Sequence, residues 1–520
     1  MKKTIWIFIS VVAFMMVMNS CREQSDNIVS YGQKDYLNFS AADTSYVEQF
    51  KALWTALNCN YGIWDYEAKY GLDWDTVYSK YLPKMQELDK RDKEDNPVTN
   101  DELENLYKEI LSPLHDGHIN IQVRNLHTNN YINISPSNIR NQYRPDYDVS
   151  RTNVSAYYQN EDMGQNKIEE IDFVGSNPYY FVKDEINGVL PYIKSWINYL
   201  NAKTGRTDLE DYQLTEFSKA YDELNNFVVT TMADVNYYNT TLTKKYEYLD
   251  ITLESFDVNP QYYMDVTYAM FNGGIVYLNF SNFFFSAYMS DVIGTTTNCQ
   301  IMKSRIDSIL SKWRDKIQTL HDAGNLKGVI IDVRNNGGGI TNDYQFILGS
   351  LLPEGGHQVA SARFKTGIGR YDYSPITPEV MSTWSPSSVG EDTPWTPISE
   401  EPIVVLANCR SVSMSEVTCL GAKQMPNARV IGTHTWGGLC LLNGDPAAYS
   451  QNYAGIIGVQ NETSFYAYIP SNVTIANDGG ILEGVGVTPD IEIQLDRNLY
   501  EATGRDTQLE RALQYIRTGN

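Results

Sequence analysis

The sequence predicts an α/β protein with a mostly parallel sheet, preceded by an N-terminal helical domain and a mixed α/β middle region. Three observations predict this class. Strand-like and helix-like segments alternate from about Gly273 onward, which is the pattern of βαβ crossovers. Apolar residues near the N-terminus recur at helical spacing. At 520 residues the chain is also too long for one compact domain.

The first twenty residues have the pattern of a secretion signal. Lys2 and Lys3 precede an apolar run from Thr4 to Met18, which is too short to span a bilayer comfortably. Asn19 and Ser20 then precede Cys21, as in a bacterial lipoprotein signal, where acylation of the thiol gives a membrane anchor without a spanning helix. An ordinary signal peptide with an incidental cysteine is the alternative. We expect a signal peptide at 1–20, lipidation at Cys21 and a polar tether over 21–40.

Residues 41–118 are predicted to form the helical domain. One apolar face carries Val47, Phe50, Leu53, Trp54 and Leu57. A second helix is expected after Asn100 as its cap, with Leu103, Leu106, Ile110 and Leu111 on its buried face. Alternation over Ile119–Val123 then predicts a strand.

The middle region, 119–270, is rich in Asn and Tyr, with a helical section near 186–235. It contains no clear glycine-led loop of the kind that binds peptide carboxylates, so no PDZ domain is predicted there.

The catalytic domain is placed at 271–496 and a terminal helix at 497–520, near 505–518. Expected strands are Gly274–Phe280, Gly328–Val333, Pro402–Ala407 and Arg429–Ile431, and expected helices lie near 300–323, 341–352 and 414–425. In such folds, reacting groups collect where strands end and loops turn into helices.

The composition excludes some functions. With 41 basic and 64 acidic residues the net charge is −23, which repels phosphate backbones and disfavours nucleic acid as a partner. Cys59, Cys299, Cys409, Cys419 and Cys440 show no zinc spacing. A disulfide between two of the last three stays open, and their main expected role is as small buried residues.

Ser413 is the candidate nucleophile. The segment from Pro402 to Glu416 runs from an apolar strand through a serine-rich turn into a helix. Free backbone N–H groups at a helix N-terminus can stabilise negative charge that develops on a substrate. A plain helix cap is the common alternative for such a serine, and Glu416 could belong to that local cap.

A second motif follows the strand Gly328–Val333, where three glycines occupy 337–339. Without Cβ atoms, Gly337 and Gly338 allow backbone N–H groups to approach a substrate oxygen and form an oxyanion hole with the amide of Met414. A phosphate loop is disfavoured because no Gly-Lys-Ser/Thr follows and the spacing is not G-x-G-x-x-G.

Together these segments resemble the carboxyl-terminal processing (tail-specific) serine protease family. Three further motifs fit the pattern: His115-Asp-Gly-His118, Arg429-Val-Ile-Gly-Thr-His-Thr-Trp-Gly438 and Glu483-Gly-Val-Gly-Val-Thr-Pro-Asp490. The resemblance covers 40–120 loosely and 270–495 well. It implies a crotonase/ClpP-like catalytic core and endopeptidase activity on unfolded or C-terminal segments.

The general base is inferred by comparison within that family. Many members use a lysine 25 residues after the serine, but position 438 is Gly438 and no lysine follows Lys423. The tricorn-core-like branch uses a histidine oriented by a glutamate. Matching its motifs gives His118 as base and Glu483 as orienting acid, with His434 in reserve. Imidazole can take and return a proton near neutral pH.

Several alternatives remain beside this assignment. His118 could be a loop or core histidine, and Glu483 a plain turn residue. His115 and His118 could hold a metal, although no further ligand pair lies at a suitable spacing. The branch carries a serine just before its histidine, where this chain has Gly117.

We therefore expect a serine-type peptidase with no metal or organic cofactor, acting on polypeptide substrates from the bacterial cell envelope, as an outer-membrane or periplasm-facing lipoprotein. A catalytically silent relative that binds peptides or other ligands is the main alternative. A glycan-handling surface lipoprotein is a third possibility, which rests only on the abundance of Tyr and Asn.

Overall fold

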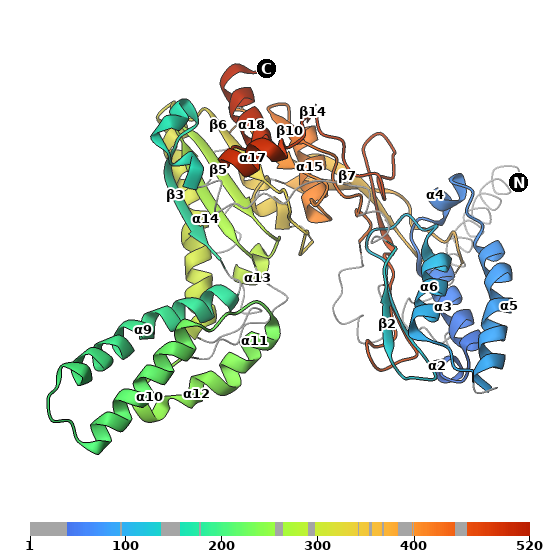
Figure 1. Ribbon diagram of the computed structural model, residues 1–520. Helices are drawn as coiled ribbons and strands as arrows, with labels where there is room; N and C mark the ends of the chain where they lie inside the picture. Colours follow the sequence, from blue (N-terminus) through green and yellow to red (C-terminus); the bar gives the residue numbers. More distant parts are fainter. Residues whose placement is uncertain are drawn as a thin grey trace, which may run out of the picture. The chain divides into compact units, whose positions relative to one another are not determined.

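The computed structural model describes residues 39–93, 96–136, 156–175, 178–254, 264–289, 297–341, 343–352, 356–366, 369–382, 398, 400–441 and 455–520. The expected signal peptide, Cys21 and nearly all of the tether lie outside these ranges. The chain divides into two compact units (Figure 1). The first comprises residues 1–148, 354–383 and 407–495, and the second comprises 149–353, 384–406 and 496–520. Residues of the expected catalytic domain, 271–496, fall in both units.

The first unit begins with the expected helices. These are α2 (Phe39–Ala42), α3 (Tyr46–Asn60), α4 (Trp64–Lys69), α5 (Trp74–Lys93) and α6 (Asn100–Leu111). The cap of α6 is Thr99 and not Asn100: the Thr99 side chain accepts from the Glu102 amide, and the Glu102 carboxylate accepts from Thr99 N in return. This reciprocal pair satisfies two backbone donors that the first turn leaves free.

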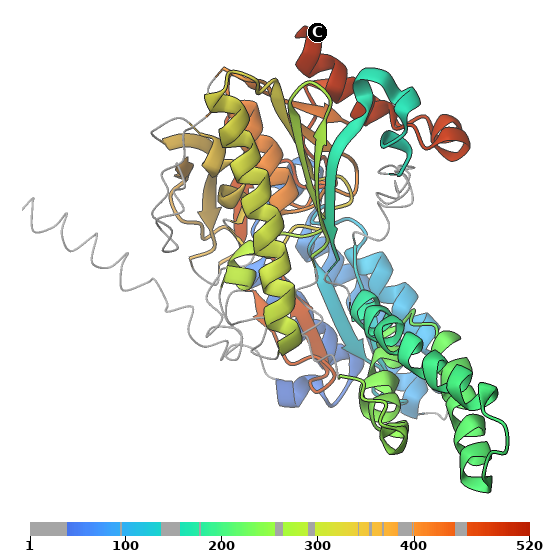
Figure 2. The same cartoon turned by 90° about the vertical axis from the view of Figure 1, so that its left-hand side faces the viewer.

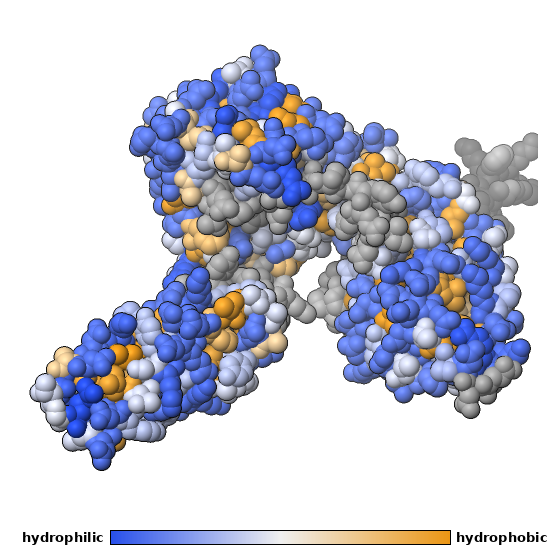
Figure 3. All heavy atoms as spheres, in the orientation of Figure 1, coloured by the Kyte–Doolittle hydropathy of each residue, from blue (hydrophilic) through white to orange (hydrophobic). Residues whose placement is uncertain are grey.

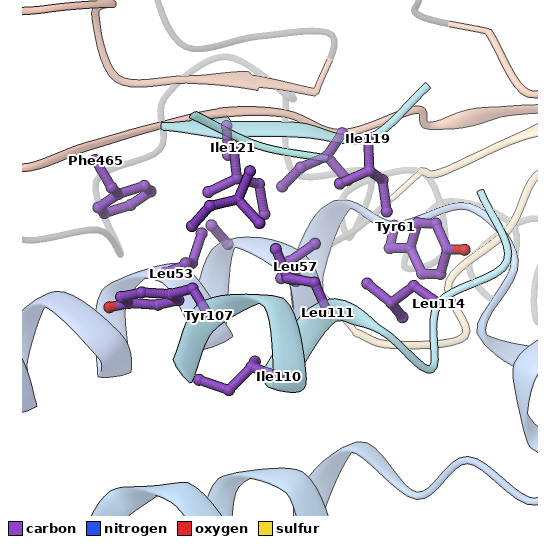
Figure 4. Close-up of a cluster of buried hydrophobic side chains, with 14 of the residues drawn as sticks. Leu53, Leu57, Tyr61, Tyr107, Ile110, Leu111, Leu114, Ile119, Ile121 and Phe465 are labelled. Atoms are coloured by element: carbon purple, nitrogen blue, oxygen red, sulfur yellow. The ribbon is translucent and has the colours of Figure 1, made fainter. Parts of the chain in front are cut away.

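The core of the first unit joins these helices to a sheet from both ends of the sequence. The antiparallel order is β11 (Ile456–Ile457), β12 (Phe465–Tyr468), β1 (Asn120–Arg124) and β2 (Tyr131–Ile134). Figure 4 shows Leu53 and Leu57 of α3 with Leu111 of α6 below Ile121 and Phe465 of the sheet. The predicted face of α3 is buried at Phe50, Leu53 and Leu57, and partly buried at Val47 and Trp54.

Two further groups of strands complete the first unit. Strands β13 (Asn472–Ile475), β7 (Gly356–Phe364) and β8 (Thr377–Ser382) form an antiparallel sheet. Strand β10 (Ala428–Gly432) pairs in parallel with β14 (Ile491–Glu492). Helix α15 (Met414–Gln424) contacts both β7 and β10.

The second unit contains strands in the order β9 (Ile403–Ala407), β6 (Gly328–Asp332), β5 (Ile275–Phe280), β4 (Val266–Phe271) and β3 (Ile168–Val174). The predicted parallel pairing holds for β5, β6 and β9, whereas β4 and β3 pair antiparallel. Helix α14 (Thr297–Asp322) lies along β3, β4 and β5 (Figure 2). Helix α13 spans Phe285–Met289.

The chain terminus packs on the same unit. Helix α17 spans Arg497–Thr503 and α18 spans Thr507–Thr518. A side chain on Gly328, at the start of β6, would meet Ile516 of α18 at 2.8 Å. The predicted terminal helix is therefore formed, and it packs against the start of β6.

The middle region contains a helical hairpin. Helices α9 (Pro178–Ala202) and α10 (Asp208–Asn225) run side by side, and α11 (Met232–Tyr237), η2 (Tyr238–Leu242), α12 (Thr243–Lys245) and η3 (Glu247–Leu249) follow. A 3₁₀ turn, η1 (Glu161–Asn166), precedes β3. Polar residues dominate the visible surface, including that of the hairpin (Figure 3).

The prediction of a helix near 341–352 is wrong. Two short 3₁₀ turns replace it, η6 (Asp343–Phe346) and η7 (Gly349–Leu351). The Asp343 carboxylate bonds the backbone amide of Ser286, and Gly349 and Pro353 are poor helix formers, so the segment stays in short tight turns. Across the described part of the chain, no helix combines the length and apolarity needed to cross a membrane.

Candidate active site

Ser413 lies at a strained turn in front of α15. It occupies the N-cap position with φ 58° and ψ −115°, a region that residues with a side chain rarely adopt. An ordinary N-cap serine has extended backbone angles, so Ser413 is more than a plain cap. Such strain persists only where the surrounding contacts enforce it, and it is concentrated at functional sites. Ser413 is 7% exposed.

The backbone amides of Ser413 and Met414 differ in whether they have a hydrogen-bond acceptor. Ser413 N donates both to the carbonyl of Gly438 and to Glu416 Oε2, each at 3.1 Å. The amide of Met414, the first residue of α15, donates to no described residue. A free donor at a helix N-terminus directly after the serine is suited to binding an oxyanion.

Glu416 is the partner that holds this turn in place. Its Oε1 accepts from Thr435 Oγ1 at 2.6 Å and from the Gly437 amide at 2.7 Å. Its Oε2 accepts from the Gly438 amide at 2.7 Å, in addition to the bond from Ser413 N. The side chain is fully buried, and this burial raises the pKa of its carboxyl group. Glu416 is therefore a cap that also binds the loop following β10.

Glu483 binds the continuation of the same loop. Its Oε2 accepts from the amides of Leu439 at 2.7 Å and Cys440 at 2.8 Å, and its Oε1 accepts from the Gly117 amide at 2.7 Å. Burial is the main cause that raises the pKa of Glu483, to about 7, and the negative charge of Glu416 adds to it. Glu483 is thus far from a plain turn residue.

His118 lies beside Gly438. A Cβ atom on Gly438 would be 3.3 Å from His118 Cε1, so the imidazole fills the space next to this glycine. The His118 amide donates to Asp116 Oδ1 at 2.7 Å. The ring is half-buried, and its desolvation lowers the pKa of His118 to about 4, which keeps the imidazole neutral.

The expected bond from Glu483 to the imidazole is not formed. Both Glu483 oxygens accept from main-chain amides, and His118 Nδ1 is buried without a hydrogen-bond partner among the described residues. The contact of Glu483 with the histidine region passes through the Gly117 amide, one residue before His118. Sequence motifs identify the residue types but cannot distinguish a ring contact from a backbone contact.

Asp116 adds a third acid behind the histidine. Ligand atoms of Asp116, Cys440 and Glu483 lie within 4.8 Å of one another, and all three residues are buried. Burial and the nearby Glu483 raise the pKa of Asp116 well above its ordinary value. The His115–His118 metal pair gains no support, because His115 Nδ1 lies 2.5 Å from Glu67 Oε2 and the ring lies tilted against that of Tyr70.

The two glycines of the expected oxyanion hole belong to the second unit. Gly338 N donates to Asn336 Oδ1 at 2.9 Å, and its carbonyl accepts from Phe283 N at 2.8 Å. The amide of Gly337 donates to no described residue, so it is the better donor of the two. A role for either glycine beside Met414 stays a prediction.

The remaining candidates from the sequence are the reserve base His434, the cysteines and Glu416. His434, the reserve base, is half-exposed in the loop after β10. Of the two histidines, His118 is the one that lies against Gly438. Cys409, Cys419 and Cys440 are buried and none of them is in a disulfide, so the disulfide left open among them is not formed. The cap that the sequence left open for Glu416 is formed through Ser413 N, whereas no sequence pattern indicates its bonds to Thr435, Gly437 and Gly438.

A comparison with known protein families matches the part of the chain that contains most of this site. Residues 301–493 match the model of peptidase family S41. This range contains Ser413, Glu416 and Glu483, and the comparisons support a serine-type peptidase. His118 lies outside the matched residues, so its place beside Gly438 comes from the structure alone.

One curated relative is a carboxy-terminal-processing protease of Bartonella bacilliformis, 26% identical over 178 residues. That alignment covers 34% of this chain and 33% of the relative, so the chain spans about a third of the relative's length.

Solved structures resemble the chain over longer stretches but at low identity. A protein of Parabacteroides merdae, provisionally described as a peptidase, is 17% identical, with 91% of this chain and 97% of that chain covered and a TM-score of 0.48. Mature CPAF complexed with lactacystin is 12% identical, covering 92% and 100%, with a TM-score of 0.44. The tricorn protease is 17% identical, covering 47% and 18%, with a TM-score of 0.27.

Proposed function

We propose that the chain is a serine endopeptidase that cleaves unfolded or C-terminal polypeptide segments, with Ser413 as nucleophile and His118 as general base. One observation carries the proposal. Gly438 accepts the amide hydrogen of Ser413 through its carbonyl, and the His118 ring occupies the space beside its Cα. A strained serine and a neutral imidazole therefore flank the same residue, at the position where lysine-dependent members of the family carry their base.

The reaction follows from these groups. Ser413 Oγ attacks the scissile carbonyl while His118 takes its proton, and the imidazolium then protonates the leaving amine. The Met414 amide binds the oxyanion, a role in which a single donor is worth about 3–4 kcal/mol in the transition state. Water next attacks the acyl-enzyme, again with His118 as base, and Ser413 is regenerated. No step requires a metal or an organic cofactor.

Glu483 supports the base in this proposal without touching its ring. Its carboxylate fixes Gly117, and through the main chain it limits the positions that His118 can adopt. This role replaces the direct ring contact of the histidine-dependent branch. In this proposal the chain shares a histidine base with that branch. It differs because Glu483 acts through the Gly117 amide and not through the imidazole ring.

We further propose that the protein acts at a bacterial cell envelope as a lipoprotein acylated at Cys21. The support is the pattern of Lys2, Lys3 and the apolar run before Cys21. Palmitate incorporation in expressing cells tests this proposal: the wild type should be labelled, and Cys21→Ser should be unlabelled and released from the membrane fraction. Equal labelling of both would exclude this anchor.

Peptidase activity is tested with purified protein and a quenched fluorescent unfolded polypeptide. Ser413→Ala and His118→Ala should each lower kcat/KM by about 10³–10⁴-fold or more, as in other serine triads. Ser79→Ala, an exposed serine on α5, serves as the matched control and should be unchanged. A fluorophosphonate probe should label the wild type and spare Ser413→Ala. A folded wild type that neither cleaves nor reacts would instead be a silent binding protein.

A further inference from the structure

We propose that Glu416 is a positioning residue for catalysis: ionised, it holds the nucleophile turn and the loop after β10 in register, and Glu483 extends the same connection to His118. This inference rests on the proposed peptidase function and assigns a role to a residue outside the Ser413–His118 pair.

The first step of the argument is the arrangement of four consecutive amides. Glu416 accepts from Gly437 and Gly438, and Glu483 accepts from Leu439 and Cys440. We call residues 437–440 the carboxylate-bound loop. Two buried carboxylates thus take every backbone N–H of this loop, which fixes its path.

The second step is what each carboxylate binds outside the loop. Glu416 accepts from Ser413 N, and Glu483 accepts from Gly117 N, which precedes His118. The nucleophile and the base, 295 positions apart, are therefore each tied to the carboxylate-bound loop through one acid. A small error in the position of a catalytic group can cost about 10²-fold in rate, so this connection is of direct kinetic importance.

The third step concerns the charge state. Glu416 accepts four hydrogen bonds and donates none, an arrangement that only the ionised carboxylate satisfies fully. Burial opposes ionisation, and the bonds from Thr435, Gly437, Gly438 and Ser413 favour it. The titratable groups facing Glu416 are Glu483, whose pKa its charge raises, and Cys419 on α15, whose thiol also faces Lys423 and Asp490.

Thr435 offers a way to perturb this charge without removing it. Its hydroxyl donates to Glu416 Oε1 at 2.6 Å and accepts from the Val487 amide at 2.7 Å. The hydrogen bond from Thr435 lowers the pKa of Glu416. Loss of this bond should therefore raise the pKa of Glu416, and the acid limb of the pH profile of kcat should move to higher pH. A purely structural role for Glu416 would lower thermal stability and leave this limb where it is.

The test compares Glu416→Gln, Thr435→Val and Thr435→Ser in the full chain, with Glu109→Gln on the exposed face of α6 as a control. Glutamine keeps one acceptor oxygen but turns its NH₂ group toward backbone donors. We expect kcat of Glu416→Gln to fall by about 10²-fold, with KM within threefold and a parallel fall in fluorophosphonate labelling. Thr435→Val should shift the acid limb upward, and Thr435→Ser should restore it.

Two results would overturn the inference: folded Glu416→Gln with kcat within threefold of the wild type, or Thr435→Val with lowered melting temperature but an unmoved acid limb. If Glu416→Gln does not fold, the comparison of Thr435→Val with Thr435→Ser tests the inference. Either result, with an active wild type and inactive Ser413→Ala, would leave the proposed function intact. An inactive and unlabelled wild type would instead refute the function itself.

Discussion

The indole Nε1 of Trp436 lies 2.7 Å from the position that a Cβ atom would take on Gly117. The tryptophan belongs to the loop after β10, and the glycine directly precedes His118. The serine found at this position in the histidine-dependent branch would therefore collide with the indole unless one of them moved. Gly117 and Trp436 are thus a matched pair that sets the distance between the two loops.

This pair gives the first prediction. Gly117→Ala should displace either Trp436 or the backbone before His118, and lower kcat by about tenfold, equivalent to about 1.4 kcal/mol. Trp436→Leu combined with Gly117→Ala should recover part of that loss, because the smaller side chain makes room for the methyl group. A double-mutant cycle on kcat measures the coupling, and strictly additive effects would contradict the contact.

The second prediction concerns the space beside Gly438. Gly438→Ala would place a methyl group 3.2 Å from Val412 Cγ1 and 3.3 Å from His118 Cε1, so the ring must shift. We expect kcat to fall by about 10- to 100-fold with little change in KM, since the base and not the substrate is displaced. Gly188→Ala on α9, where a Cβ meets nothing within 4 Å, is the control. Unchanged kcat in Gly438→Ala would argue against His118 as the base.

The third prediction is the pH profile. His118 has its pKa lowered to about 4 and is already neutral in weak acid, whereas burial raises the pKa of Glu483 to about 7. The ionisation that limits activity on the acid side should therefore be that of the buried carboxylates. We expect kcat/KM to rise with pH with a midpoint near 7, and a midpoint below 5 would assign the limb to His118 alone.

The same shifts have a definite sign for stability. A raised folded-state pKa of Glu483 stabilises the fold below pH 4.5, and this contribution is lost as the pH rises through about 7. The lowered pKa of His118 acts in the opposite sense, since its contribution is present above 6.5 and is lost as the pH falls toward 4. Urea unfolding between pH 6.5 and 7.5 should thus show a falling contribution from Glu483, which Glu483→Gln removes.

The fourth prediction concerns the second unit. The buried Arg334 guanidinium lies 2.7 Å from both Asp332 Oδ2 and Asp506 Oδ2, and Asp506 also accepts from the first amides of α18. Asp506→Ala removes one partner of a buried charge, and we expect it to lower the free energy of unfolding by about 3–5 kcal/mol. Chemical denaturation measures this, with exposed Asp101→Asn as the control. A loss below 1 kcal/mol would show that Asp332 alone satisfies Arg334.

Local features of the fold follow from the sequence, and long-range ones do not. Apolar spacing predicts α3, the alternation of strands and helices predicts α14, and apolar runs predict β5, β6 and β9. The pairing of β1 with β12 joins Ile121 to Ala467, and no local pattern specifies a partner at that separation. The 341–352 segment shows the same limit, because the tertiary bond of Asp343 overrides a plausible helical pattern.

The candidate site divides in the same way. Ser413 is predictable because a strand, a serine-rich turn and a helix follow one another, and His118 because a family motif contains it. The binding partners of Glu416 and Glu483 are backbone amides, which every residue carries. Residue types therefore cannot reveal them, and only coordinates show that two acids hold one loop.

The backbone from Thr435 to Leu441 turns seven successive amides toward the protein itself, onto Val487, Ser411, Glu416, Glu483 and Asn472. An extended peptide that enters this region cannot add itself as a new strand by borrowing these donors. In the proposed peptidase, the carbonyl groups of such a peptide would have to find donors elsewhere, and recognition beside this loop would depend on side chains such as Trp436. Sequence preference near the scissile bond should then respond to the shape of that indole more than to main-chain pairing.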